Sequence, residues 1–167
     1  MRAMTEENLK AAFAGESQAH MKYLSFSEKA QTEGKPNVAR LFAAASFAEQ
    51  AHATAHLRTL KGIGKTAGNL AIAIGGEDFE VSEMYPAYIA VAEAQDEGGA
   101  KKSFFRAFEA EKVHRSLYER AREAVDAGSD VDLGSVCVCE CCGWTGEGDA
   151  PDRCPLCNAP KDRIRQF

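Results

Sequence analysis

Apolar residues recur every three or four positions along most of the first 127 residues, which is the period of an amphipathic helix. Breaks rich in glycine or proline divide this region into four predicted helices of about 25 residues each. Their expected ranges are 5–33, 36–61, 69–97 and 100–127. Four helices of this length, joined by short breaks, predict an all-α four-helix bundle. The glycine-rich link 62–68 could join neighbouring helices or serve as a crossover.

The ends of these helices follow from local chemistry. Thr5 is expected to cap the first helix, Pro36 suits the first turn of the second, and Asn69 can cap the third. The third helix also contains two consecutive glycines, at 75–76, and Pro86. These residues can kink or interrupt it, because proline lacks an N–H and glycine weakens a helix.

Each predicted helix carries one glutamate at the centre of an apolar stripe: Glu16, Glu49, Glu77 and Glu111. The neighbours three, four and seven positions away are, helix by helix, Leu9, Ala12, Phe13, Ala19 and Tyr23; Phe42, Ala45, Ser46, His52 and His56; Leu70, Ala73, Ile74, Glu80 and Met84; and Phe104, Ala107, Phe108, His114 and Tyr118. Three of the four acids lie near mid-helix, and therefore at one level. Glu77 lies closer to its predicted helix start at Asn69 than the other acids do to theirs, so this helix either starts elsewhere or is offset along the bundle.

With Glu80, five glutamates and two histidines converge on this level. An unpaired buried carboxylate carries a penalty of several kcal/mol and tends to take up a proton. Among the cationic side chains, only Arg115 has a comparable position, four residues after Glu111. The compensating charge is therefore expected to be metal. Two divalent ions, or two ferric ions with a bridging oxide, roughly balance five carboxylates.

Two Glu-x-x-His units, "EQAH" at 49–52 and "EKVH" at 111–114, strengthen this hypothesis. One Glu from each of two helices, plus Glu-x-x-His from the other two, is the donor set of di-iron carboxylate bundles. Oxygen-rich ligation with one imidazole per ion suits iron or manganese. A single such unit could occur by chance on a solvated helix face, but two in matching positions favour metal. His20 and His56 are expected to be hydrogen-bonded rather than primary ligands.

All six cysteines lie after residue 136, in the tail "VCVCECCGWTGEGDAPDRCPLCNAP". Two Cys-x-x-Cys units predict a tetrahedral four-thiolate metal site, formed by Cys139, Cys142, Cys154 and Cys157. Gly143 and Asn158 follow the second cysteine of each unit and tolerate a positive φ. Zinc and iron both accept this geometry, so a structural zinc ribbon is the alternative. The adjacent di-metal bundle favours iron.

Composition changes at Gly128, from Ala-, Glu- and Lys-rich to Gly-, Asp-, Pro- and Cys-rich. We therefore expect a helical domain over 1–128 and a small loop and β domain over 129–167. The net charge of −5 makes nucleic acid and anionic membranes poor partners. With neither a signal peptide nor a long apolar run, a cytoplasmic location is expected.

Taken together, these motifs resemble the rubrerythrin family, which joins a ferritin-like di-iron bundle to a rubredoxin-like domain. The resemblance covers essentially the whole chain through "GESQAH", "FAEQAH", "GGEDFEVSEMYP", "EAEKVH", "CECCGW" and "CPLCNAP". It implies that Glu49 and Glu111 bridge two irons, that Glu16 binds the first, and that Glu77 with His114 binds the second.

The resemblance assigns further roles around the first iron. Glu80 and His52 would be its alternative ligands as the oxidation state changes, and Tyr23 and Tyr85 would hydrogen-bond the carboxylates. The four cysteines of the paired units would hold one iron. Departures from the family pattern lie in the same module, where Cys137 replaces a common aromatic residue, Cys141 fills a variable place, and Asn158 stands at a usual glycine.

The function implied is a peroxidase that reduces hydrogen peroxide to water, with electrons passing from the thiolate iron to the di-iron site. An external reductase or small redox protein would supply them, with NAD(P)H as the remote source. The resemblance further implies a homodimer or larger homo-oligomer, in which the cysteine domain of one subunit lies against the bundle of another. The alternatives are a ferroxidase or iron-handling protein and a purely structural pair of zinc sites.

Overall fold

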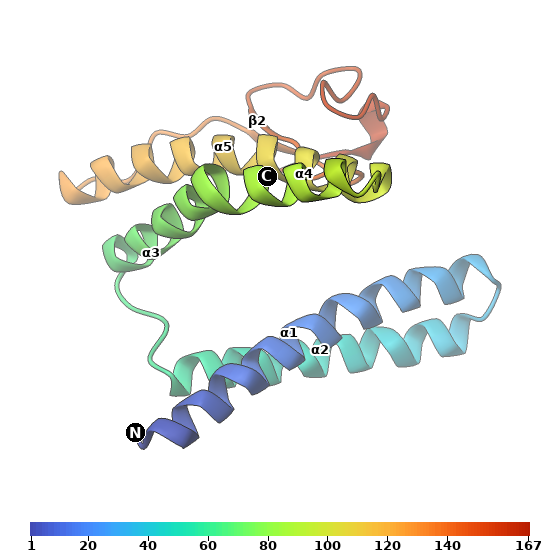
Figure 1. The fold of residues 1–167 in the computed structure, drawn as a ribbon, viewed down its shortest axis with the longest axis horizontal. Coiled ribbons are helices and arrows are strands. Elements are labelled where there is room, and N and C mark those ends of the chain that lie inside the picture. Colours follow the sequence, from blue (N-terminus) through green and yellow to red (C-terminus); the bar gives the residue numbers. More distant parts are fainter. The chain divides into compact units, whose positions relative to one another are not determined.

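The computed structural model describes residues 1–167, which form two compact units, 1–64 and 65–167. The first unit is a helical pair, α1 (Ala3–Thr32) and α2 (Pro36–Thr59), which run side by side (Figure 1). The second contains α3 (Thr66–Phe79), a π-helical turn η1 (Glu80–Met84), α4 (Tyr85–Ala94) and α5 (Gly98–Asp126), followed by a small sheet. The predicted order, four long helical stretches and then a small β domain, is confirmed.

In the first unit, small residues let the two helices approach closely. The buried positions are Ala30 on α1 and Ala39, Ser46 and Ala53 on α2. Pro36 occupies the first turn of α2, as predicted, because its missing N–H would have no partner there. The predicted cap at Thr5 is wrong: α1 begins two residues earlier, and its N-cap residue, Arg2, makes no side-chain cap hydrogen bond.

In the second unit, α3, η1 and α4 form one continuous helical run alongside α5 (Figure 1). The predicted cap at Asn69 is wrong, since α3 begins at Thr66 after Lys65. The helix is indeed irregular, but the irregularity is the π turn over 80–84 rather than a break at the paired glycines. The π turn ends at Met84, and Pro86 then lies in the first turn of α4.

The corrected helix starts remove the apparent offset of Glu77. Glu16, Glu49 and Glu111 each lie 13 residues beyond the first residue of α1, α2 and α5. Glu77 lies 11 residues beyond the first residue of α3. All four acids therefore lie near the middle of their helical stretches, which the sequence predicted for three of them.

The C-terminal part of the second unit is a three-stranded antiparallel sheet, in the order β2 (Thr145–Glu147), β1 (Val136–Cys139) and β3 (Ile164–Gln166). A short 3-10 turn, η2 (Lys161–Arg163), precedes β3. The sheet's core is made largely of the cysteines themselves, with Ala150 and Ile164. Trp144 lies over Gly146, where any added Cβ would approach the indole ring to 2.6 Å. Only glycine fits that position without displacing the ring.

No helix of the chain is both long enough and apolar enough to cross a bilayer. The boundary that composition places at Gly128 stays a prediction, because the two compact units divide earlier in the chain, between Gly64 and Lys65.

Candidate metal centres

The first helical pair carries one carboxylate–histidine group. Glu16 on α1 joins Glu49 and His52 on α2, and their donor atoms all lie within 4.8 Å of one another. The imidazole Nδ1 of His52 is 3.0 Å from Oε2 of Glu49. Hydrogen bonds with His52 and with Glu16 hold the pKa of Glu49 below its usual value. Two helices thus bring two acids and one imidazole together.

The second unit carries a matching group. Glu77 on α3 joins Glu111 and His114 on α5, again with all donor atoms within 4.8 Å. The Nδ1 atom of His114 is 2.6 Å from Oε2 of Glu111 and 4.0 Å from Oε1 of Glu77. Each unit therefore supplies one Glu-x-x-His and one further Glu, which is half of the donor set predicted from the sequence.

Glu77 shows the electrostatic strain that the sequence argument anticipated. Its side chain is only 16% exposed, and its buried Oε2 has no hydrogen-bond partner. Burial, followed by the charge of Glu111, a hydrogen bond with Glu111 and the charge of Glu80, raises its pKa to about 7. An orphaned carboxylate oxygen beside an imidazole and a second carboxylate is what a divalent cation would satisfy. The residues present therefore fit a metal.

The other predicted residues of the site are distributed around these groups. Glu80 opens the π turn, and burial together with the charge of Glu111 raises its pKa. Burial, and then the charges of Glu80, Glu111 and Glu77, raise the pKa of Tyr85. Tyr23 instead contacts the rings of Phe26 and Phe42. The acids of the second group therefore raise the pKa values of Glu80 and Tyr85. The roles expected of Tyr23, Tyr85 and Glu80 stay predictions.

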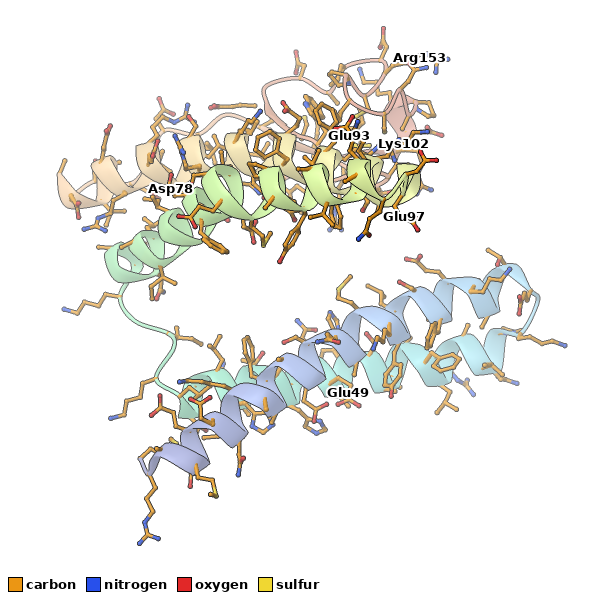
Figure 2. All side chains as sticks on the ribbon, viewed as in Figure 1. Glu49, Asp78, Glu93, Glu97, Lys102 and Arg153 are labelled. Atoms are coloured by element: carbon orange, nitrogen blue, oxygen red, sulfur yellow. The ribbon has the colours of Figure 1, made fainter.

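Arg115 does not neutralise the acids. Its guanidinium donates to Oδ1 of Asp78 at 2.8 Å and lies 3.6 Å from Glu119 (Figure 2 labels Asp78). Arg115, whose sequence position suggested that it could replace a metal, is therefore paired with other carboxylates.

His20 is a hydrogen-bonded histidine of the helix pair, as predicted. Its Nδ1 lies 2.9 Å from the carbonyl of Ser46 and 3.0 Å from the Ser46 hydroxyl, which donates to the His20 carbonyl. Ser46 is 2% exposed, so these contacts tie α1 to α2 inside the unit. Neither His20 nor His56 belongs to a metal-ligating group.

The four cysteines of the paired units form the third group, with all sulfurs within 4.8 Å of one another. Sγ of Cys139 is 3.6 Å from Sγ of Cys157, and Sγ of Cys142 is 3.6 Å from Sγ of Cys154. A tetrahedral ion with metal–sulfur bonds of ~2.3 Å separates its sulfurs by about 3.8 Å. The thiols are free rather than disulfide-bonded, and their spacing fits one tetrahedral ion.

The backbone around the sulfurs follows the predicted knuckle geometry. Gly143 and Asn158 have φ values of 77° and 63°, in the left-handed region anticipated from the sequence. Burial alone would raise the pKa of Cys157, but hydrogen bonds from the backbone of Ala159 and from the other thiols lower it to about 7. Burial raises the pKa of Cys142.

The two surplus cysteines lie outside this group. Cys137 is buried on β1, and its thiol donates to the carbonyl of Gly148 at 3.1 Å. Cys141 is exposed within the first knuckle. Neither displaces a predicted ligand, so the paired units keep the expected positions.

Thr145 joins the cysteine domain to the second carboxylate–histidine group, and sequence reasoning missed it. Its hydroxyl donates to the carbonyl of Gly143 at 3.1 Å and lies 2.8 Å from Nε2 of His114. Both ring nitrogens of His114 therefore have a partner, because Nε2 contacts Thr145 and Nδ1 lies 2.6 Å from Oε2 of Glu111.

A second contact fixes the same placement. Arg120 on α5 donates to Oε2 of Glu147 on β2 at 2.7 Å. Within the chain, the cysteine domain packs on α5, because these two side-chain contacts and β2 itself meet that helix. The expected contact of this domain with the bundle of another subunit stays a prediction.

Two family models match the chain. The rubrerythrin model matches residues 7–122, and the model described as the rubredoxin-like domain of rubrerythrin matches residues 138–165. These ranges contain the two carboxylate–histidine groups and the four clustered cysteines, respectively.

Individual relatives agree over nearly the full length. Rubrerythrin-2 of Clostridium acetobutylicum is 36% identical, over 99% of this chain and 97% of that protein. Nigerythrin of Nitratidesulfovibrio vulgaris is 36% identical, over 98% of this chain and 86% of that protein. A solved structure described as the fully reduced, all-ferrous state of nigerythrin matches with a TM-score of 0.53 at 35% identity, covering 98% of this chain and 86% of that one.

The geometry and the comparisons agree on the cofactors. The chain carries the donor set of a di-iron centre, in two carboxylate–histidine groups, and a four-cysteine iron site. The predicted class, a four-helix bundle followed by a rubredoxin-like domain, is confirmed.

Proposed function

Because the chain belongs to the rubrerythrin family, we propose that it is a peroxidase that reduces hydrogen peroxide to water at the di-iron centre. The reaction consumes one peroxide, two electrons and two protons, and it yields two water molecules. When bound, two ferrous ions supply the electron pair and the Lewis acidity that cleavage of the O–O bond requires. The residues of the chain hold the ions, deliver protons and conduct the replacement electrons.

In this proposal, Glu16, Glu49 and His52 would hold one iron, and Glu77, Glu111 and His114 would hold the other. Glu80 is the proton carrier. Its raised pKa, caused by burial and by the charge of Glu111, favours a carboxyl group that keeps a proton near the reacting oxygens.

The observation that carries the proposal is the hydrogen-bonded path from the thiolate site to the carboxylate–histidine group. It runs from Cys142 through the adjoining carbonyl of Gly143 to the hydroxyl of Thr145, and from there to Nε2 of His114. The resulting connection joins a one-electron site to a two-electron site within one chain. Such a connection supports a turnover enzyme that must be re-reduced after each peroxide.

Iron storage or ferroxidation uses the same bundle ligands but needs no thiolate electron port, whereas this chain devotes residues 136–167 to one. A purely structural zinc protein would not need the two sites to be linked. The chain therefore favours a peroxidase over iron storage or ferroxidation and over a structural zinc protein. The external donor is proposed to be a redox protein or reductase fed by NAD(P)H, and the location is proposed to be cytoplasmic.

A homodimer is part of the proposal. It is carried over from the family resemblance.

Stopped-flow reoxidation of the fully reduced protein tests the function. We expect hydrogen peroxide to restore the oxidised spectrum much faster than dioxygen at equal concentration, and Glu80→Ala to lose that advantage. Glu83→Ala, an exposed glutamate of the same π turn, is the matched control. If peroxide is no quicker than dioxygen, the peroxidase assignment fails.

A further inference from the structure

A cavity of about 450 Å³ opens beside the four-cysteine site. The first turns of α5 form one wall, with Lys102, Ser103 and Arg106, and the first knuckle forms the other, with Cys141 and Cys142. All of these residues lie in the second unit (Figure 2 labels Lys102). The cavity therefore reaches a sulfur ligand from the surface.

The cavity is locally positive in a chain whose net charge is −5. Lys102 and Arg106 form no ion pair within the chain, whereas the neighbouring Lys101 is bound to Glu93 at 2.7 Å. Arg163 lies nearby but is paired with Glu140 at 3.5 Å, so the positive charge of the cavity comes from Lys102 and Arg106. Two unpaired cations facing a common space create a local site for negative charge.

The sulfur at this cavity is also accessible. Cys139 and Cys154 are 1% and 2% exposed, while Cys142 and Cys157 are only partly buried, and of these two only Cys142 lines the cavity. An electron must enter the site through a ligand that a donor can approach. Cys142 is such a ligand, and it is also the one from which the path through Gly143 leads to His114.

We propose that this cavity is the docking surface for an acidic one-electron carrier protein, whose carboxylates bind Lys102 and Arg106 while its redox group faces Cys142. The inference rests on the proposed function, because it assumes that the four-cysteine iron is reduced from outside. In the step itself, one electron leaves a reduced flavin or iron–sulfur carrier, and the ferric thiolate site becomes ferrous. No bond is made or broken.

The test is stopped-flow reduction of the oxidised, iron-loaded full chain by flavodoxin hydroquinone, an acidic carrier, followed at the thiolate-to-iron absorption. For the parent we expect a rate constant that falls steeply between low and high salt. Lys102→Glu combined with Arg106→Glu should slow reduction by about 10-fold or more at low salt and flatten the salt dependence. Lys161→Glu, an exposed lysine of the same small domain outside the cavity, should retain most of the parent's rate.

Reduced methyl viologen, a small radical cation, separates docking from damage. The double variant should accept electrons from it at least as fast as the parent, because the added negative charge attracts a cation. Slower reduction by both donors, or equal slowing by Lys161→Glu, would overturn the proposal, as would a double variant that flavodoxin reduces at the parent rate.

This experiment is independent of peroxide chemistry. If the reduced chain proves indifferent to peroxide while the salt and charge effects hold, the docking surface stands and only the peroxidase fails. If peroxide is consumed but the charge reversals change nothing, only the docking surface fails.

Discussion

The two carboxylate–histidine groups use the same residue types at the same spacing, yet their histidines are held differently. In the first unit, the His52 ring has one partner, Glu49. In the second unit, the His114 ring is held at both nitrogens, by Glu111 and by Thr145. One imidazole is held at a single nitrogen, while the orientation of the other is fixed by contacts at both nitrogens.

The pKa values of the glutamates also differ between the two groups. The pKa of Glu49 is lowered by its hydrogen bonds with His52 and Glu16, whereas burial and the charge of Glu111 raise that of Glu77 to about 7. The second group is therefore rigid and strained without a cation, and the first is internally satisfied. The expected exchange of His52 and Glu80 as ligands of the first iron stays a prediction.

The largest effect should come from Glu111→Ala, because this carboxylate contacts His114 and lies beside Glu77 and Glu80. We expect loss of at least one bundle iron per chain and peroxide reoxidation slower by ~100-fold or more. Iron analysis and stopped-flow spectroscopy measure the two. Glu109→Gln, whose carboxylate is paired with Lys112 instead, should behave like the parent. Full iron content in the Glu111 variant would contradict its role.

Exchanging the histidines for alanine compares the groups directly. His114→Ala removes a ligand held at two points, so ferrous affinity should fall by ~100-fold. His52→Ala should lower it by about 10-fold, because the family resemblance implies that Glu80 replaces this ligand. Anaerobic calorimetry with Fe²⁺ gives both values. Equal losses, or a larger loss for His52, would mean that the asymmetry of the two groups has no consequence for binding.

The raised pKa of Glu77 makes the metal-free protein sensitive to pH. Folding holds its proton up to about pH 7, while the unfolded chain releases it near 4.5, so this stabilisation is present at low pH and lost as pH rises between these values. The free energy of unfolding should fall by about 1–2 kcal/mol, a discounted value because the site is partly solvated. Urea titrations of Glu77→Gln should lack this slope, whereas Glu83→Gln should keep it.

Thr145→Val should leave both metal sites loaded but slow electron transfer between them by about 10-fold, since it removes the hydroxyl that links Gly143 to His114. Thr145→Ser should restore the rate. Nitrogen NMR of His114 in the metal-free protein provides a readout independent of turnover: the valine variant should shift the Nε2 resonance, because Nε2 loses its hydrogen-bond partner. An unchanged Nε2 resonance and rate would show that the contact is only incidental packing.

Sequence periodicity and spacing were enough to predict the four helical stretches, both Glu-x-x-His units and the four clustered cysteines. They failed where the outcome depends on contacts between distant segments. Thr145 lies 31 residues from His114, and nothing in its local sequence marks a partner. The start of α3 at Thr66 was also missed, because no side-chain cap announces it. Proline and glycine indicated irregularity in this helix, but its form as a π turn beginning at Glu80 depends on the fold.

The central claim is that the buried carboxylates are tolerated because they bind two cations. Its most direct test is anaerobic Fe²⁺ titration of the full chain at pH 6.5 and pH 8, with the four-cysteine site already filled by zinc. The account predicts two ferrous ions per chain and proton release that is larger at pH 6.5, where Glu77 with a pKa of about 7 is still largely protonated. A chain that stays folded and takes up no ferrous ion, or that binds it with the same proton release at both pH values, would contradict it.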